Sequence, residues 1–265
     1  MNALTDELCG KCILFLIIFQ ALIVCSGLSD LVFRFRRVKQ AEVDIVSSDF
    51  YSSVLASLRE SLTDLRSPDI GEIVCFGLGK ICECTISRYQ LALLLSLREK
   101  YAVELYVYDP VFTEREVVIL NELDCRVLSE NIEGKYKVDG DKSTLFYLPH
   151  CSKQLSNNLL WANWGLQLSR CVIIANSFNK IVETNTKKTN QNIDYILNVS
   201  PYTSEFCIIN TFKYFDIFND TSIHVFPLDK LNLLSEDFWS YNFEPKYLKN
   251  DVEFISVSLE QDLHV

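Results

Sequence analysis

The sequence has too few basic residues for a protein that binds nucleic acid through its phosphates. Lysine and arginine total 25, against 35 aspartate and glutamate residues, so the formal net charge is -10. Binding to a phosphate backbone needs clustered positive charge. The one short basic cluster, within residues 34–39, precedes the main body of the chain. We therefore expect no direct binding to nucleic acid.

The ten cysteines also lack the paired spacing of a secreted disulfide framework or of a zinc site. Cys75, Cys171 and Cys207 lie inside apolar runs, which is typical of reduced cysteines in a core. None of the cysteines precedes a proline, so the dipeptide that would indicate haem binding is missing. No nucleophile–base motif such as G-x-S-x-G occurs either. These absences favour an intracellular, reducing compartment and predict no metal site.

The N-terminus contains an uncharged, mostly apolar run over residues 12–29, between Lys11 and Asp30. Its length is at the lower limit for a membrane-spanning helix. Asp6 and Glu7 precede it, so the basic n-region of a signal peptide is missing. Basic residues follow the run, so an anchor would leave the domain in the cytoplasm. Three interpretations stay open: a segment foreign to the domain, which we favour, a membrane anchor, or a cleaved signal.

Apolar segments alternate with stretches of helical periodicity along most of the chain. We expect strands over 72–76, 103–108, 126–128, 144–148, 171–175 and 223–226, and helices over 41–65, 81–100, 113–123 and 155–168. This alternation predicts an α/β fold, a Rossmann-like three-layer sandwich with a mostly parallel sheet, preceded by an N-terminal amphipathic helix. Polar residues 180–192 are expected to form a surface linker. The predicted organisation is an apolar segment 1–33, a domain 34–250 and a tail 251–265.

Each expected strand ends in polar or flexible residues, and ligands of open parallel sheets bind beyond such ends. Gly77 and Gly79 follow the first strand, where backbone N–H groups at a helix start favour an anion. Asp109 ends the second strand, where such folds commonly hold ribose hydroxyls. Cys82 replaces the third glycine of a G-x-G-x-x-G motif. An equal alternative is therefore that the glycines serve a tight strand-to-helix turn and that Asp109 caps a turn before Pro110. The other candidates at strand ends are His150, Asn176 and Ser177.

A second polar set lies within residues 216–224 and comprises Asp216, Asn219, Asp220, Thr221 and His224. Such side chains hydrogen-bond to neighbouring backbone and build a rigid turn before a strand. Alternatively, they complete a site from the far edge of the sheet. Histidine titrates near neutral pH, so His150 is either a general acid or base or a structural hydrogen-bonded residue.

Several segments together resemble the Sensitivity to Red light Reduced (SRR-like) domain family over about residues 34–245. They are CFGLG at 75–79, VYDPVF at 107–112, LSEN at 128–131, PHC at 149–151, NLLW at 158–161 and DIFNDTS at 216–222. The resemblance implies a regulatory protein of the cytoplasm and nucleus with a protein partner. It implies roles in circadian rhythm and clock-gene expression, in regulation of haem biosynthesis, and in plants in light signalling.

No catalytic residues come with this resemblance, which favours a non-enzymatic role. Without a cysteine–proline dipeptide, haem contact would need another ligand, such as His150 or His224. The alternative is a Rossmann-like group-transfer enzyme that binds S-adenosylmethionine or a nucleotide at the glycine turn. The cofactor, haem or S-adenosylmethionine, therefore stays open, as does a membrane-anchored form if residues 12–29 act as an anchor.

Overall fold

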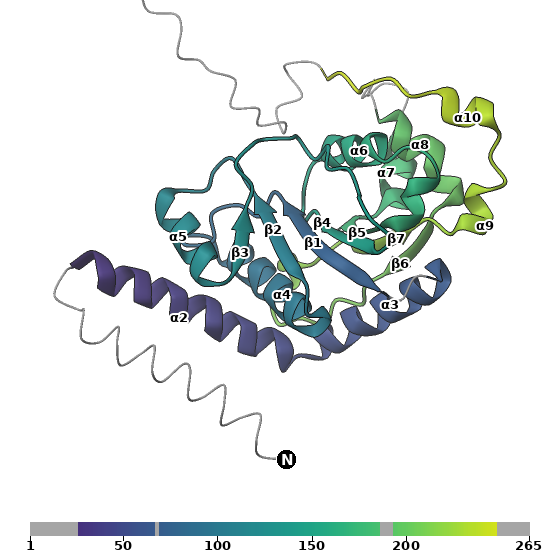
Figure 1. Cartoon of the computed structure of the whole chain (residues 1–265). Helices are drawn as coiled ribbons and strands as arrows, with labels where there is room; N and C mark the ends of the chain where they lie inside the picture. The colour runs from purple at the N-terminus through teal and green to yellow at the C-terminus, as the bar shows by residue number, and fades with distance from the viewer. Residues whose placement is uncertain (1–25, 67–68, 186–192, 248–265) are drawn as a thin grey trace, which may run out of the picture.

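The computed structural model describes residues 26–66, 69–185 and 193–247 (Figure 1). The tail 251–265 and residues 12–25 of the uncharged run lie outside these ranges. Within them, no helix combines the length and apolar character needed to cross a bilayer. The proposed boundaries of the domain stay predictions.

A seven-stranded sheet in the order β3-β2-β1-β4-β5-β7-β6 forms the centre of the fold. Its strands are β1 (Ile70–Phe76), β2 (Glu104–Tyr108), β3 (Cys125–Val127), β4 (Ser143–Tyr147), β5 (Cys171–Asn176), β6 (Ser204–Cys207) and β7 (Thr221–Val225). The first five run parallel, whereas β7 is antiparallel to β5 and β6 is antiparallel to β7. The predicted α/β class with a mostly parallel sheet is therefore confirmed. Because β7 is reversed, its first residues lie at the edge where the parallel strands end.

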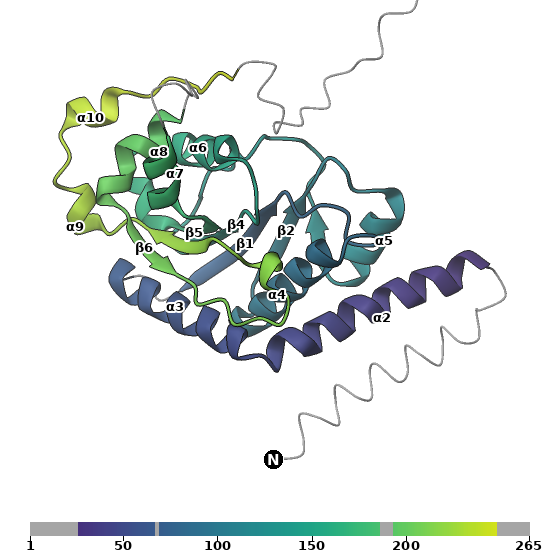
Figure 2. The same ribbon diagram turned by 180° about the vertical axis from the view of Figure 1, so that it is seen from behind.

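Alternation along each buried strand divides the helices into two layers (Figures 1 and 2). Ile73 and Cys75 of β1 face the core beneath α2 to α5, whereas Val74 and Phe76 face the core beneath α6 to α8. The first layer holds α2 (Ser26–Val46), α3 (Asp49–Leu65), α4 (Thr85–Tyr101) and α5 (Glu114–Glu122). The second holds α6 (Lys153–Ala162), α7 (Phe178–Thr184) and α8 (Asp194–Val199), and the chain continues into α9 (Leu228–Leu231) and α10 (Glu236–Ser240). Since side chains of a strand point alternately to opposite faces, this is the expected three-layer sandwich.

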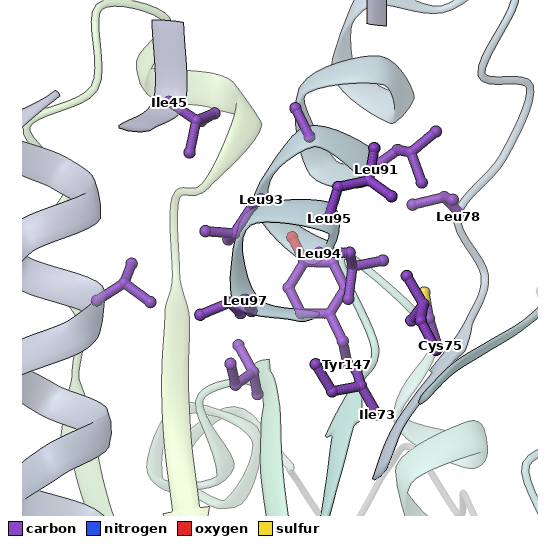
Figure 3. Packing of buried hydrophobic residues seen from close by; sticks show 14 of the residues in the cluster. Ile45, Ile73, Cys75, Leu78, Leu91, Leu93, Leu94, Leu95, Leu97 and Tyr147 are labelled. Atoms are coloured by element: carbon purple, nitrogen blue, oxygen red, sulfur yellow. The ribbon is translucent and has the colours of Figure 1, made fainter. Parts of the chain in front are cut away.

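Helix α4 is the best-buried helix of the first layer, because its leucines are buried on most sides of the helix. Leu91, Leu94 and Leu95 have no exposed surface. Figure 3 shows these leucines in one cluster with Ile73 and Tyr147 of the sheet. Burying a leucine side chain contributes about 1.5–3 kcal/mol, so these leucines hold α4 firmly in the core with the sheet.

The single helix predicted over 41–65 is wrong, because the chain forms two helices there. Helix α2 ends at Val46 and α3 begins at Asp49. Ser48 caps α3 by accepting a hydrogen bond from the Tyr51 N–H, while Ser47 donates back to the Val43 carbonyl. Both helices bury apolar residues in the same core, so the hydrophobic repeat continues across the break. The period alone therefore could not reveal it.

Other boundaries were also misjudged. The helix predicted over 155–168 ends at Ala162, and a 3-10 turn at Leu166–Arg170 follows it. Part of the predicted linker 180–192 belongs to α7, which ends at Thr184, and residues 186–192 lie outside the described part. Strand β6 was not predicted. By contrast, the capping box at Thr113 is confirmed: Thr113 and Glu116 bond reciprocally at the start of α5.

Candidate functional site

The glycine turn after β1 is closed by the carboxylate at the end of β2. Gly77 and Gly79 have φ values of 74° and 76°, which glycine adopts without strain. The Gly79 N–H donates to Asp109 Oδ2 at 2.7 Å, and the Val111 N–H donates to Oδ1 at 2.9 Å. Asp109 is only 8% exposed. Both carboxylate oxygens therefore bind the protein's own backbone, one in the turn at Pro110 and the other in the glycine turn.

Two side chains fill the space in front of the glycines. A Cβ atom on Gly77 would lie 2.3 Å from Cys151 Sγ, and one on Gly79 would lie 2.7 Å from Ser87 Oγ. The Cys151 thiol donates to the Phe76 carbonyl at 3.2 Å. Burial raises the pKa of this thiol, so it stays a neutral donor. Close internal packing and the positive φ values therefore account for glycine at both positions.

His150 and Asn176 tie the loop after β4 to its neighbours. The exposed His150 has a φ of 52°, and its Nε2 lies 2.9 Å from the Ile217 carbonyl, to which it donates. Asn176 at the end of β5 donates from Nδ2 to the Cys151 carbonyl at 2.9 Å. Cys151 therefore connects the glycine turn with the ends of β4 and β5.

Most of the set at 216–224 reaches the same edge of the sheet. Thr221 of β7 pairs with Asn176, and the Ser177 N–H donates to the Asp220 carbonyl at 3.2 Å. Asp220 also pairs with Lys180 at 2.6 Å. Among the described residues, the buried Oδ1 atom of Asn219 has no hydrogen-bond partner. Asp216 is exposed beside Ile217, which His150 contacts.

His224 lies away from this edge, in the core between β7 and α7. It has no exposed surface and stacks on Phe178 with ring centres 3.8 Å apart. Nδ1 lies 3.1 Å from the Ile173 carbonyl, and Nε2 accepts from the Phe178 N–H at 3.2 Å. Both ring nitrogens therefore face partners within the protein, and Glu205 Oε2 also lies 3.6 Å from Nε2. His224 is not available to ligate haem, which leaves His150 of the two proposed ligands.

The structure brings together His150, Asn176, Ser177, Asp216, Asn219, Asp220 and Thr221, and holds Gly77, Gly79 and Asp109 in the adjoining turn. The sequence did not predict that Cys151 and Ser87 pack against Gly77 and Gly79, because nothing in the residues next to them indicates these contacts. In the described part of the chain, no group of three or more histidine, cysteine, aspartate or glutamate side chains is placed to hold a metal ion. A binding role for the candidate residues stays a prediction.

The fold and this edge define a Rossmann-like α/β protein whose nucleotide-type turn is filled by its own side chains. A family model described as the SRR1 domain matches residues 53–225. The chain belongs to the SRR1 domain family, and membership supports a regulatory role of the SRR type.

Curated relatives match over most of their length. An SRR1-like protein of Mus musculus is 39% identical, over 62% of this chain and 80% of its own. An SRR1-like protein of Drosophila melanogaster is 30% identical, over 77% of this chain and 72% of its own. Protein SENSITIVITY TO RED LIGHT REDUCED 1 of Arabidopsis thaliana is 32% identical, over 69% of this chain and 70% of its own.

Similar solved structures are distant. A mutant of MtNAS is 14% identical over 73% of this chain and 70% of its own, with a TM-score of 0.38. The plantazolicin methyltransferase BpumL, in complex with a monoazolic desmethylPZN analog and SAH, is 10% identical over 79% of this chain and 94% of its own, with a TM-score of 0.33. Similarity at these TM-scores carries no argument about function.

Proposed function

We propose that this chain is an intracellular regulatory protein that acts by binding a protein partner in the cytoplasm and nucleus. Its role is in circadian rhythm and clock-gene expression and in regulation of haem biosynthesis, the counterpart of light signalling in plants. Support comes from membership in the SRR1 domain family and from the name of the Arabidopsis relative.

The observation that favours regulation over group transfer is the filled glycine turn. A cofactor phosphate or carboxylate at this position would need backbone N–H groups that point into open space. Here Asp109 takes the Gly79 N–H, and Cys151 occupies the position in front of Gly77. The Gly77 N–H donates to the Tyr108 carbonyl at 3.2 Å, so both glycine N–H groups already have partners within the protein, which supports the regulatory role.

A surface suited to a protein partner lies beside this edge, on the loop between β6 and β7. Ile209 is 71% exposed, Phe215 is 61% exposed and Tyr214 is 47% exposed. Asn210 stiffens the loop, because its side chain donates to the Phe215 carbonyl and accepts from the Phe212 N–H. Large apolar side chains held rigidly in solvent are typical of interaction sites.

The test is rescue of cells that lack the protein. Wild-type chain should restore clock-gene rhythm and haem level, whereas the double variant Ile209→Ser/Phe215→Ser should fail although it folds and accumulates. Leu228→Ser/Leu233→Ser is a matched control, because Leu228 and Leu233 are 47% and 79% exposed elsewhere on the surface. If loss of the protein leaves both rhythm and haem unchanged, the proposed role is wrong. If the double variant rescues fully, the proposed role still stands, but the partner does not bind at Ile209 and Phe215.

Ligand binding by the full chain separates this role from the enzymatic alternative. Thermal-shift profiles are measured with S-adenosylmethionine, S-adenosylhomocysteine, NAD(P), ATP and haemin. A ligand at 100 times its dissociation constant would stabilise the fold by about 2.7 kcal/mol. We expect no shift with the first four. A shift with one of them would favour a group-transfer enzyme.

Carbonate extraction of cell membranes tests whether residues 12–29 act as a membrane anchor. Recovery of the protein in the soluble fraction would contradict the anchor.

A further inference from the structure

Strand β6 leaves one edge of the sheet open. It is the last strand in the order β3-β2-β1-β4-β5-β7-β6, and within residues 26–66, 69–185 and 193–247 no strand pairs with its outer side. None of its four residues is buried. In Figure 2, β6 lies between α9 and α3. An open edge of this kind is a template for pairing with another strand.

The register with β7 shows which backbone groups of β6 face outward. In an antiparallel ladder, hydrogen-bonded residue pairs alternate with non-bonded pairs. The Ile208 N–H donates to the Thr221 carbonyl at 3.3 Å, and Phe206 precedes Ile208 by two residues. Phe206 and Ile208 therefore direct their N–H and C=O groups toward β7. The N–H and C=O groups of Glu205 and Cys207 point away from β7, and no strand of the described part of the chain meets them.

A second copy of β6 matches this outward pattern. If a two-fold axis passes beside Phe206, Glu205 of one copy lies opposite Cys207 of the other, and the reverse. Each outward N–H then meets an outward carbonyl, so the two strands form four hydrogen bonds and leave none of these groups over. The two Phe206 residues form the non-bonded pair between them, in which cross-strand side chains approach most closely.

The surface beside β6 has room for the second Phe206 ring and charges that suit a surface like itself. A groove of about 580 Å³ lies between α3 and the start of α9, and Phe206 lines it together with Ala56. Its charged residues are of both signs: Arg59, Glu60, Asp64, Arg66 and Asp229. A strongly acidic or strongly basic segment would be repelled by one of the two sets. A second copy would bring the same mixture in reverse order, which would place opposite charges within reach of each other.

We propose that this chain forms a symmetric dimer, in which two β6 strands pair antiparallel about a two-fold axis at Phe206. The pairing joins two sheets into one continuous sheet. Its polar part is the outward backbone of Glu205 and Cys207, and its apolar part is the groove beside Phe206. The proposal is independent of the regulatory role, because it uses only the geometry of this edge.

The first experiment measures the mass of the full-length chain by sedimentation equilibrium over a wide range of protein concentration. The dimer has twice the monomer mass of 30.6 kDa. Cys207→Pro removes an outward N–H but no bond to β7, and proline is tolerated on an edge strand where its nitrogen faces solvent. We expect this variant to fold and to show the monomer mass. Cys207→Ser is the matched control, because it keeps the N–H and should remain a dimer.

Two results of this experiment would overturn the proposal. One is a wild-type chain with the monomer mass at every concentration, which would leave the edge to an extended segment of another protein. The other is a dimer that persists in a folded Cys207→Pro variant.

If the proline variant does not fold, amide hydrogen exchange of the wild-type chain decides. The amides of Glu205 and Cys207 should exchange more slowly in a concentrated than in a dilute sample, because only the dimer gives them a hydrogen-bond partner. The Ile208 amide is already bonded to Thr221 and should change less. Equal exchange of Glu205 and Cys207 in the two samples would refute the pairing.

Discussion

Replacement of Asp109 by alanine tests whether this carboxylate is a structural cap or a ligand-binding group. The side chain is 8% exposed and accepts hydrogen bonds from the Gly79 and Val111 N–H groups. Asp109→Ala would leave both donors without their partner inside a well-packed turn. If the residue is a cap, the variant loses stability; if it serves only a ligand, the fold is unaffected.

The expected magnitude follows from the two bonds. A hydrogen bond to a charged group contributes about 1.5–3 kcal/mol, and a buried donor left unsatisfied costs about 1–3 kcal/mol. Because both bonds belong to one side chain, and water will reach part of the turn, their effects are not simply additive. We expect the free energy of unfolding to fall by about 3 kcal/mol.

Urea denaturation of the full-length chain measures this loss. Asp109→Asn keeps one acceptor oxygen and should lose less than the alanine variant. Asp216→Ala removes an exposed aspartate from the same edge of the sheet and should change stability by no more than about 0.5 kcal/mol. A loss below about 0.5 kcal/mol in Asp109→Ala would refute the capping role.

Three further predictions concern other parts of the fold. Thr113→Ala removes a side of the capping box and should cost about 1 kcal/mol in urea denaturation, whereas Thr113→Ser should cost less. Gly77→Ala places a Cβ 2.3 Å from Cys151 Sγ at a φ of 74°, so its melting temperature should fall; adding Cys151→Ala should restore only part of the loss, because the backbone strain remains. Equal melting temperatures for the single and double variants would contradict the clash. The hydrogen bond from Lys213 holds the pKa of Asp44 below its ordinary value of 3.8. The stabilisation by this carboxylate is therefore complete above that value and is lost as pH falls below it, so Asp44→Asn should flatten the acid limb of a stability–pH curve.

Local signals were sufficient for much of the fold. Strand β1 is buried on both faces, so its sequence is a nearly continuous apolar run. It could therefore be predicted from its own residues, without knowledge of the neighbouring strands. The start of α5 was predicted because both residues of the capping box, Thr113 and Glu116, lie within one turn. In both cases the physical cause of the structure lies inside the segment that adopts it.

Features set by distant contacts were not predictable in this way. Strand β6 has only four residues, and none of them is buried, so its sequence resembles a loop. The direction of β7 is set by the path of the chain through α7, α8 and β6, and a short apolar strand carries no sign of it. The break between α2 and α3 was not predicted, because the new helix start at Ser48 leaves the apolar face of the two helices continuous.

The glycine turn shows why the candidate site was harder to interpret than the fold. Glycine is needed wherever another group approaches the backbone closely, whether that group is a cofactor phosphate or a side chain of the same protein. At Gly77 the approaching group is the Cys151 sulfur, which lies 74 residues further along the chain. The motif is therefore identical for a cofactor cradle and for a packed turn, and the deciding residue lies outside it. For that reason, a glycine-rich turn after a first β-strand indicates a Rossmann-like fold with more force than it indicates a bound nucleotide.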